Sequence, residues 1–344
     1  MKKIFVLGRD KVGWSIDEDR NNVINFINSL DDFKITKNIF NADIIYCVWY
    51  NILLKPVFYY LLKMIKLVRN VKVIAVITND ITKSLESSNN FKKLKNSRLI
   101  NYWVVSNKKM KHYLNNGCNI KNVIVIPYYI DEIIYKKEDA KKENFCRIFD
   151  INYNKVKDKL LIGSFQRDSQ GFDLSIPKWQ KNPKGLFNTI KEFKDEAVLI
   201  LAGPRRHWII NMCKKNNIPY IFIGNKLNID NNKDDIHINN LDSFIINLLY
   251  NMIDIYLVTS ISESGPKAIL EASLCKTFIL STDVGLASEI LHEDLIIDDR
   301  LMSKKLMKLY KDKNKYIEYN YNNVNKKISF EELKSKYKKL LNEV

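Results

Sequence analysis

The sequence predicts an α/β protein with two doubly wound domains, one after the other along the chain. Short apolar runs rich in β-branched and aromatic residues alternate with amphipathic segments through almost the whole sequence. Such runs are typical of parallel strands that are buried on both faces, and their alternation with helices is typical of doubly wound sheets. The chain has 344 residues, of which 46% are hydrophobic, so it is long enough for two cores of ordinary size.

The first domain is predicted over residues 1–130. Its two clearest helical patterns cover 56–70 and 107–117, and the second ends on Gly117, a residue type favoured just after a helix. Its strands are expected at 3–8, 42–50, 72–80, 101–106 and 122–128.

The second domain is predicted over residues 158–315, after a charged and weakly periodic stretch at 131–157 that we interpret as a linker region. Residues 316–344 form a C-terminal helical segment, in which Ser329 and Glu332 make a capping box. We therefore expect two Rossmann-like domains that face a cleft, with a C-terminal helix that crosses back and packs across both. The strands of the second domain are expected at 159–167, 197–204, 219–224, 253–260, 276–283 and 294–298.

The formal net charge is +17, and it is concentrated in the first part of the chain. Residues 1–150 hold 26 Lys and Arg against 15 Asp and Glu, whereas residues 151–344 hold 30 against 24. A basic first half suits an anionic partner, such as phosphates, nucleic acid or an acidic membrane face. The alternative is an ordinary solvated basic surface.

Cysteine and histidine usage indicates a cytoplasmic protein with no metal site. The five cysteines form no C-x-x-C pair, and the four histidines are isolated from one another and from the cysteines. The N-terminus lacks the pattern of a signal peptide, and no apolar run reaches 18 residues, so we expect no membrane span.

The most informative motif is E-S-G-P-K-A-I-L-E-A, in which Glu263 and Glu271 stand eight positions apart. It follows a predicted strand, and Pro266 suits the start of a helix. The two carboxylates would lie at most ~12 Å apart along the helix axis. Between them, the free N–H groups of Ser264 to Lys267 would form an anion site at the positive end of the helix dipole. The alternative is two solvated acids that complement this dipole.

This motif, followed by a strand and S-T-D-V-G, resembles the retaining glycosyltransferases of family 4, which have the GT-B fold and an E-x7-E motif. The resemblance covers about residues 159–300. It implies that Glu263 orients the hexose hydroxyls of a nucleotide-sugar donor and that Glu271 holds its ribose. Cys275 and Thr277 depart from the family, which usually has Gly and Pro there. The donor-binding residues implied between the two glutamates are Ser264, Gly265, Pro266 and Lys267.

Cations follow the first strand of the second domain. This strand ends near Gly163, a candidate donor-binding residue, and Arg167 comes next. A diphosphate that leaves without a metal needs fixed cations, and the resemblance implies that Arg167 and a lysine before the next helix supply them. Lys184 is the preferred lysine, but residues 168–180 look like an insertion. The choice among Lys178, Lys181 and Lys184 therefore stays open.

The first domain offers fewer candidates. Gly8 and Gly13 lie in a loop after the first strand, where the resemblance implies an approach to the donor phosphates or the acceptor. Trp14 and Asp80 are acceptor-side candidates, and Asp80 is alternatively a cap for the next helix. The acidic triplet 17–19 precedes a predicted helix instead of ending a buried strand, so we do not interpret it as a metal-binding D-x-D motif.

Two further segments could contact an anionic ligand or surface, but their sequence signals are less specific. Arg205, Arg206 and His207 follow the second strand of the second domain and could meet a phosphate or base, or be exposed in the first turn of a helix. The helix at 56–70 is aromatic on one side and basic toward its end, so it could lie on an acidic membrane or pack as an ordinary surface helix.

We therefore predict a metal-independent retaining glycosyltransferase with no cofactor. Its catalytic residues would be Glu263, Arg167 and Lys184. The resemblance and the charge imply a glycan or lipid-linked glycan acceptor in polysaccharide, lipopolysaccharide or glycolipid synthesis. The protein would act in the cytoplasm, with peripheral contact at the inner face of the cytoplasmic membrane.

The sequence leaves three alternatives. A sugar-nucleotide epimerase has a similar two-domain form, but we find no acid and base residues for it. A basic nucleic-acid-binding protein would explain the charge, but the sequence has no aromatic platform or reading motif, so we do not expect nucleic acid as a partner. An inactive glycosyltransferase-like subunit is disfavoured by the presence of Glu263, Glu271 and Arg167.

Overall fold

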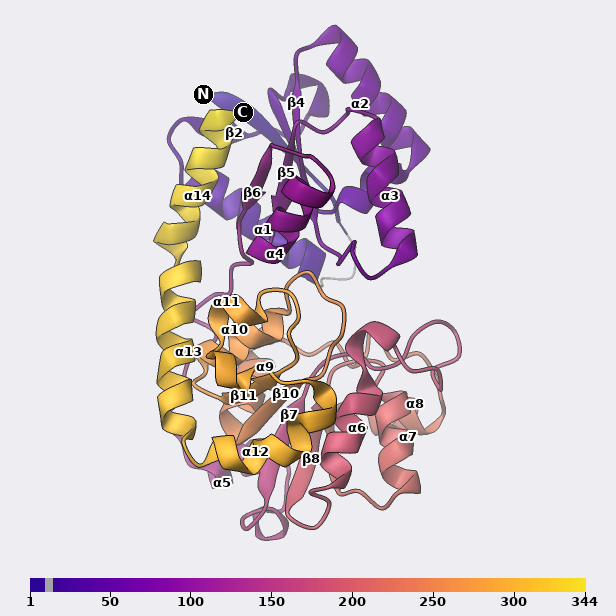
Figure 1. The fold of residues 1–344 in the computed structure, drawn as a ribbon, viewed down its shortest axis with the longest axis vertical. Coiled ribbons are helices and arrows are strands. Elements are labelled where there is room, and N and C mark those ends of the chain that lie inside the picture. The colour runs from indigo at the N-terminus through magenta and orange to yellow at the C-terminus, as the bar shows by residue number, and fades with distance from the viewer. Residues whose placement is uncertain (10–14) are drawn as a thin grey trace. The chain divides into compact units, whose positions relative to one another are not determined.

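The computed structural model describes residues 1–9 and 15–344 (Figure 1). The chain forms two compact units that are not contiguous in sequence. The stretch at 131–157, expected as a linker region, is part of the second unit and contains helix α5 (Lys142–Ile148). The first unit comprises Met1–Tyr129, Glu263–Gly265 and Lys326–Val344, and the second comprises Ile130–Ser262 and Pro266–Asn325.

The first unit is built on a parallel sheet of six strands in the order β2-β1-β3-β4-β5-β6. The five expected strands are present, and the three-residue strand β2 is an addition at the edge beside β1. Because all four residues of β3 are buried, the central strands are covered on both faces. The strands are β1 (Lys2–Leu7), β2 (Phe33–Ile35), β3 (Ile44–Cys47), β4 (Lys72–Ile77), β5 (Tyr102–Val105) and β6 (Val123–Val125).

The helices of the first unit begin with the caps that their sequences provide. The Ser84 hydroxyl accepts a hydrogen bond from Ser87 N, and the Ser329 hydroxyl accepts one from Glu332 N, as the predicted capping box requires. The helical elements are α1 (Ser15–Asn28), η1 (Ile39–Asn41), η2 (Tyr50–Leu54), α2 (Pro56–Val68), α3 (Leu85–Asn96), α4 (Lys108–His112), η3 (Tyr113–Gly117) and α14 (Phe330–Glu343).

Helix α14 completes the core of the first unit. The ring of Phe26 on α1 stacks on Phe330 and on Tyr337, with centroid distances of 4.8 and 4.9 Å. The ring of Tyr46 on β3 lies 6.1 Å from that of Tyr337. Residues from the two ends of the sequence therefore share one aromatic cluster.

The second unit has a parallel sheet of five strands in the order β11-β10-β7-β8-β9. The strand predicted at 294–298 is wrong: this segment begins with a 3-10 turn, η6 (Glu293–Leu295), and Ile296 makes only a single bridge to Ser281. The strands are β7 (Leu160–Ser164), β8 (Ala197–Ala202), β9 (Tyr220–Ile223), β10 (Ile255–Val258) and β11 (Phe278–Ser281).

Helices alternate with these strands and continue after them. Helix α13 (Lys313–Ile328) begins in the second unit and ends in the first. Among residues 1–9 and 15–344, no helix is long and apolar enough to cross a membrane. The other helical elements are η4 (Tyr153–Lys155), η5 (Trp179–Lys181), α6 (Pro183–Lys191), α7 (His207–Lys215), α8 (Lys226–Asp230), α9 (Ser243–Met252), α10 (Lys267–Leu274), α11 (Ala287–Ile290), η7 (Asp299–Leu301) and α12 (Met302–Tyr310).

The strand orders locate the sites where each sheet can bind a ligand. Strand order reverses between β7 and β10 in the second sheet, and between β1 and β3 in the first. In open α/β sheets, ligands bind outside the carboxyl ends of the strands at such a point. The loops that follow β7 and β10 therefore lie where a ligand of the second sheet is expected to bind.

Candidate functional site

Three loops meet at the carboxyl edge of the second sheet. The Ser260 hydroxyl, after β10, donates to Gln166 Oε1, after β7, at 3.2 Å. The Thr259 hydroxyl donates to Asn182 O at 3.0 Å, and Ile261 N donates to Gln180 O at 2.8 Å. These bonds fix the segment before α6 against the switch point between β7 and β10.

Arg167 lies half-buried in the loop directly after β7. Burial lowers the pKa of its guanidinium, and the positive charge of Arg205 lowers it further, whereas Asp234 raises it. An arginine remains charged at neutral pH even after such shifts. A cation that is partly withdrawn from water attracts an anion more strongly than a solvated one does.

Directly after Arg167, Asp168 forms a buried ion pair with Arg206. The two side chains are 2% and 0% exposed, and Arg206 Nε lies 3.1 Å from Asp168 Oδ2. The two groups are not aligned for a hydrogen bond, so the attraction is Coulombic. Burial raises the pKa of Asp168 to about 6, although Arg206 and several hydrogen bonds act in the opposite direction. The Arg206 guanidinium also donates to the Ser164 hydroxyl at 3.2 Å.

The Asp168 carboxylate also organises the start of helix α7. Its Oδ1 accepts from Ile209 N at 3.3 Å and from the Ser169 hydroxyl at 3.2 Å, and the latter accepts from Trp208 N. The backbone N–H groups of Asp168 and Ser169 both donate to Arg205 O. The loop after β7 and the loop after β8 are therefore one hydrogen-bonded unit.

The loops after β8 and β9 are joined in the same way. The Arg205 guanidinium makes two hydrogen bonds to the Asp234 carboxylate, at 3.0 and 2.6 Å. Asp235 accepts from Arg205 N at 2.8 Å and from the Asn239 amide at 2.7 Å, and Asn239 in turn accepts from Asn225 N. The carboxyl edge from β7 to β9 is thus held by buried charges and amides, and Arg205 is engaged within it.

The lysine candidates occupy different environments. Lys184 is exposed on α6, whereas Lys178 and Lys181 are half-buried in the preceding segment. The first turn of α6 is capped by its own Asn182, whose Oδ1 accepts from Gly185 N at 3.2 Å. This cap already uses one of the backbone donors that a free helix start would offer to an anion.

Gly163 lies inside β7 and not in the loop after it. It is buried, and a Cβ at this position would clash with Ile253. The glycine therefore allows the strand to pack closely against the segment that follows α9.

Glu271 lies in the second turn of α10, and its position is set by α9. The Tyr250 hydroxyl donates to Glu271 Oε2 at 2.8 Å, and Tyr250 itself is 1% exposed. The two departures from the family pattern support this arrangement. The Thr277 hydroxyl donates to Tyr250 O at 2.9 Å, and Cys275 Sγ donates to Asn247 Oδ1 at 3.1 Å.

The turn before α10 belongs to the first unit, because Glu263–Gly265 group with it. Ser264 is buried, and its hydroxyl donates to Ile77 O at 3.1 Å. Its carbonyl accepts from the Ser106 hydroxyl at 2.8 Å and from the Asn107 amide. Ser264 therefore fixes the turn before α10 through its hydrogen bonds to Ile77, Ser106 and Asn107. The neighbouring Glu263 is half-buried. Pro266 caps the start of α10, where Lys267 is the first helical residue.

The candidates in the first unit are dispersed. Gly8 follows β1 with φ at +116°, and a Cβ there would lie 2.8 Å from Val48, so this turn needs glycine. Gly13 and Trp14 fall outside the described residues. Asp80 accepts from Thr82 N at 2.9 Å and so shapes the turn after β4, while α3 is capped by Ser84.

Within 1–9 and 15–344, no group of three or more His, Cys, Asp or Glu side chains could hold a metal ion. This includes the acidic residues of the triplet at 17–19, which lie in the first turns of α1.

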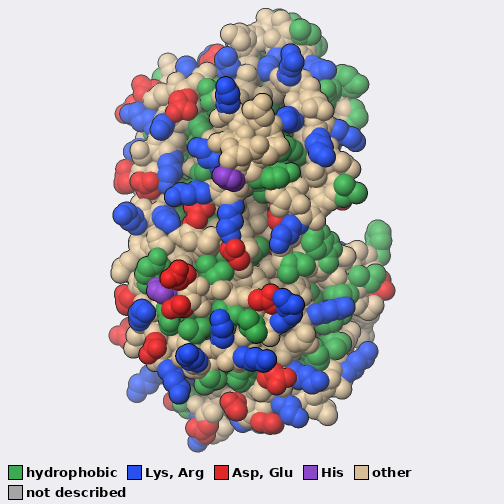
Figure 2. All heavy atoms as spheres, in the orientation of Figure 1, with side chains coloured by type: hydrophobic (Ala, Val, Ile, Leu, Met, Phe, Trp, Pro, Cys, Tyr) green, Lys and Arg blue, Asp and Glu red, His purple; other side chains and the backbone are tan. Residues whose placement is uncertain are grey.

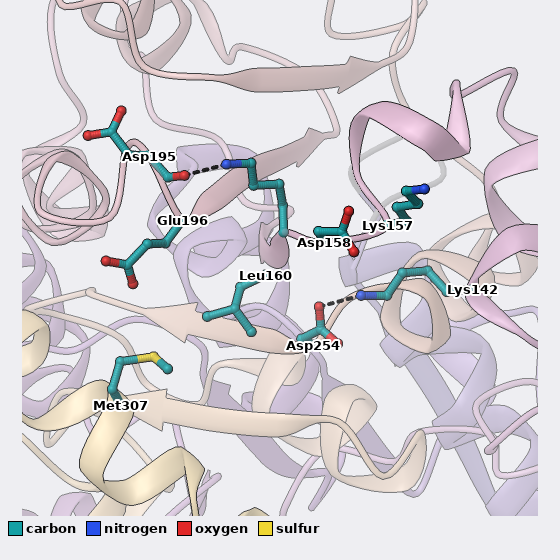
Figure 3. A pocket seen from close by; sticks show the side chains of 9 residues that line it. Lys142, Lys157, Asp158, Leu160, Asp195, Glu196, Asp254 and Met307 are labelled. Carbon is teal, nitrogen blue, oxygen red and sulfur yellow. Dashed lines mark hydrogen bonds and ion pairs between the residues drawn. The ribbon is translucent and has the colours of Figure 1, made fainter.

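A pocket lies at the opposite edge of the second sheet (Figure 3). It has a volume of about 520 Å³ and is lined by residues that precede strands, including Asp254 before β10 and Glu196 before β8. Its side chains largely satisfy one another: Lys142 Nζ lies 2.7 Å from Asp254 Oδ2, and Lys159 Nζ donates to Asp195 O. Because ligands bind at the carboxyl ends of parallel strands, we do not assign the active site to this pocket.

Comparison with known proteins identifies the class of enzyme. Residues 176–326, which include α6, β10 and α10, match the family model described as glycosyl transferases group 1. The protein is a glycosyltransferase. No curated protein sequence matches the chain.

Solved structures share the fold of this glycosyltransferase. The Anabaena protein Alr3699/HepE, solved with UDP and glucose, is 13% identical, and the similarity covers 100% of both chains with a TM-score of 0.73. A glycosyltransferase from Rickettsia africae is 16% identical over 100% of this chain and 99% of its own, with a TM-score of 0.69. TarM of S. aureus is 14% identical over 93% of this chain and 58% of its own, with a TM-score of 0.61. The predicted GT-B-like fold is confirmed.

Proposed function

We propose that this glycosyltransferase binds a nucleotide-sugar donor at the carboxyl edge of the second sheet. The proposal is carried by Arg167, which lies directly after β7, together with the hydrogen bond from Tyr250 on α9 to Glu271 on α10. The first supplies positive charge for a diphosphate, and the second presents a carboxylate for the two hydroxyls of a ribose. Structures of similar fold were solved with UDP-glucose and with UDP and GlcNAc, which supports a donor of this kind.

The proposed reaction transfers the sugar to an acceptor hydroxyl with retention of configuration at the anomeric carbon and without a metal ion. Arg167 stabilises the negative charge that develops on the leaving diphosphate, with one of Lys178, Lys181 and Lys184 as a second cation. Glu263 orients the hexose hydroxyls. The leaving diphosphate oxygen takes the proton of the attacking hydroxyl, so the chain itself need not supply a base.

The proposed acceptor is a glycan, free or lipid-linked, of a cell-surface polysaccharide, lipopolysaccharide or glycolipid. Support comes from the TarM structure, which contains fondaparinux and α-GlcNAc-glycerol, and from the basic first part of this chain. The proposed setting is the cytoplasm, at the inner face of the membrane.

A thermal-shift screen against UDP, GDP, ADP, CMP and their sugars tests the donor. A ligand at 100 times its Kd should raise the free energy of unfolding by about 2.7 kcal/mol. A donor that leaves the melting temperature unchanged at saturating concentration is excluded, and failure of all of them would contradict the proposal. Incubation with the donor alone separates the alternative, because an epimerase would convert the sugar without an acceptor.

Steady-state kinetics with the identified donor test the residue roles. Arg167→Ala should lower kcat by about 100-fold, as loss of one transition-state donor does elsewhere. Glu271→Ala should mainly raise the donor KM, because it removes binding that is present before the reaction. Lys194→Ala, an exposed cation on the same unit, is the control. If neither Arg167→Ala nor Glu271→Ala differs from this control, the site is wrongly assigned.

Stereochemistry and metal independence are measured on the same reaction. The anomeric configuration of the product glycoside, read from its NMR coupling constant, should be the same as that of the donor. Added EDTA should leave the rate unchanged. An inverted product or complete loss of activity with EDTA would overturn the corresponding part of the proposal.

A further inference from the structure

Helix α2 exposes an apolar stripe along its outer face. Val57, Tyr60, Met64, Leu67 and Val68 are between 50% and 89% exposed. At about 100° per residue, these five positions fall within an arc of about 100° on the helix surface. They extend over about 16 Å of the helix axis. Figure 2 shows hydrophobic and cationic side chains together at the edge where Figure 1 draws α2.

The other face of α2 already holds the helix in place. Leu62 and Ile65 are 0% and 3% exposed and belong to the core of the first unit. The stripe is therefore not needed to pack the helix. Exposed apolar side chains that line up on one helix face mark an interaction surface more often than single exposed ones do.

Cations border this stripe, and acidic residues are absent from its neighbourhood in sequence. Residues 44–79 contain five Lys and Arg and no Asp or Glu. Lys66 donates to Leu99 O at 2.7 Å, and Arg69 lies 3.7 Å from Asp43, so both contact the first unit itself. Lys55 and Lys63 are exposed beside the stripe.

We propose that α2 docks the first unit on the surface of an anionic lipid bilayer. The apolar stripe enters the boundary between headgroups and acyl chains, and Lys55 and Lys63 meet the lipid phosphates. This is the arrangement that an amphipathic helix with an apolar face and basic flanks adopts on a membrane. This proposal names the surface by which the protein would contact the membrane. It rests on the proposed function in one respect, namely that a lipid-linked acceptor lies at the same membrane surface.

The charge of the stripe's surroundings favours a bilayer over a second copy of the chain. In a two-fold dimer, the same patch meets itself, so the cations that border the stripe in both copies would be brought into one interface. No acidic residue in 44–79 would offset that repulsion. An anionic bilayer covers the apolar stripe and neutralises the cations at the same time.

Co-sedimentation of the full chain with vesicles tests this proposal, without donor or acceptor. Binding is expected to vesicles of phosphatidylcholine mixed with phosphatidylglycerol, and to be much weaker to phosphatidylcholine alone. The double variant Leu67→Gln/Val68→Gln should bind the anionic vesicles with an affinity lower by about tenfold or more. Lys63→Gln should lose about fivefold at low salt, and the loss should shrink as salt is added.

Matched variants elsewhere control for exposure and charge. Leu227→Gln removes a 71% exposed apolar side chain from α8, and Lys305→Gln removes an exposed cation from α12. Both should bind vesicles as the unchanged protein does. Because Leu67 and Val68 are at least 80% exposed, their variant should keep its melting temperature.

The proposal is overturned if the Leu67→Gln/Val68→Gln variant binds as the unchanged protein does, or if the unchanged protein does not bind. It is also overturned if sedimentation velocity shows a dimer that this variant dissociates. Transfer to a water-soluble acceptor should stay unchanged in the variant. Loss of vesicle binding with intact transfer would thus separate the docking surface from the active site, and loss of transfer in all proteins would instead count against the proposed function.

Discussion

The carboxyl edges of the two sheets are stabilised by different kinds of interaction. In the second unit, the edge buries charged side chains, including Asp168, Arg206 and Asp235. In the described part of the first unit, the buried polar side chains are the neutral Ser106, Asn107 and Ser264. Its edge has a cavity of about 30 Å³ that is lined mainly by aromatic and aliphatic side chains, together with Asp19 and Asn22.

This difference matches the ligands that we propose for the second unit. A diphosphate needs cations and dipoles that are already in position before the reaction, because reorganising them costs free energy. Buried charged side chains that are held by hydrogen bonds in a single arrangement keep these groups in position. Aromatic surfaces such as those of Tyr46 and Tyr337 have fewer directional constraints and can be replaced more freely.

The largest effect that would separate the two edges is expected from Arg206→Met. This change leaves the buried Asp168 carboxylate without its cation, so the free energy of unfolding at pH 8 should fall by about 3–5 kcal/mol. The control is Arg205→Met, whose partner Asp234 is 46% exposed. Its cost should stay below about 1 kcal/mol in the same urea titration. Equal losses for the two variants would show that burial of the pair is not what stabilises this edge.

The raised pKa of Asp168, about 6, leads to a pH effect in the second unit. In the unfolded chain, an aspartate titrates near 3.9. Between these values the folded protein holds a proton that the unfolded chain lacks, so this carboxyl adds stability that is complete below about pH 4 and is lost as the pH rises through about 6. Relative to Asp168→Asn, the unchanged protein should lose about 1–3 kcal/mol of unfolding free energy between pH 4 and pH 7. Parallel stability curves for the two proteins would contradict the assignment.

Tyr250→Phe tests whether the second unit positions Glu271 for the donor. Removing the hydroxyl that donates to Glu271 should raise the donor KM about tenfold and leave kcat within about twofold. Tyr319→Phe, at a 47% exposed position on α13, is the matched control. A fall in kcat with unchanged KM would instead place Tyr250 in the chemical step.

The smallest effect is expected in the first unit, from Tyr337→Phe. The ring would stay stacked on Phe26, and only the hydrogen bond between the Tyr46 and Tyr337 hydroxyls would be lost. The free energy of unfolding should fall by about 1 kcal/mol in a denaturant titration. A loss above about 3 kcal/mol would mean that this edge depends on polar bonds as strongly as the other one does.

Much of the fold follows from local sequence patterns. Apolar runs such as 72–80 and 197–204 form strands, because parallel strands are buried on both faces and need continuous hydrophobic sequence. Strand β2 is not predicted, because its three residues are too few to show a recognisable hydrophobic pattern. The run at 294–298 looks like a strand, but it pairs at only one residue.

The candidate site is only partly predictable from the sequence. The E-x7-E motif and Arg167 stand in fixed relation to predicted strands, so they can be found by spacing. The Asp168–Arg206 pair joins two loops whose residues are 38 positions apart in the sequence. No local sequence pattern predicts that the Arg206 side chain is 0% exposed. Tyr250 resembles any core residue of an amphipathic helix until α10 is placed beside it. The doublet Arg205–Arg206 is the one sequence signal for these ion pairs. Arg206 forms the buried pair with Asp168, and Arg205 forms a partly exposed pair with Asp234.

The return of the chain to the first unit has a consequence for its synthesis. The rings of Phe330 and Tyr337 cover Phe26, yet α14 is translated about 200 residues after β6. At about 5–20 residues per second, the ribosome takes about 10–40 s to cover that distance. During this interval, the nascent first sheet must expose the aromatic surface that α14 will later bury. The second unit, which ends at Asn325, can therefore be complete before the first one is, and the order of folding on the ribosome need not follow the order of the sequence.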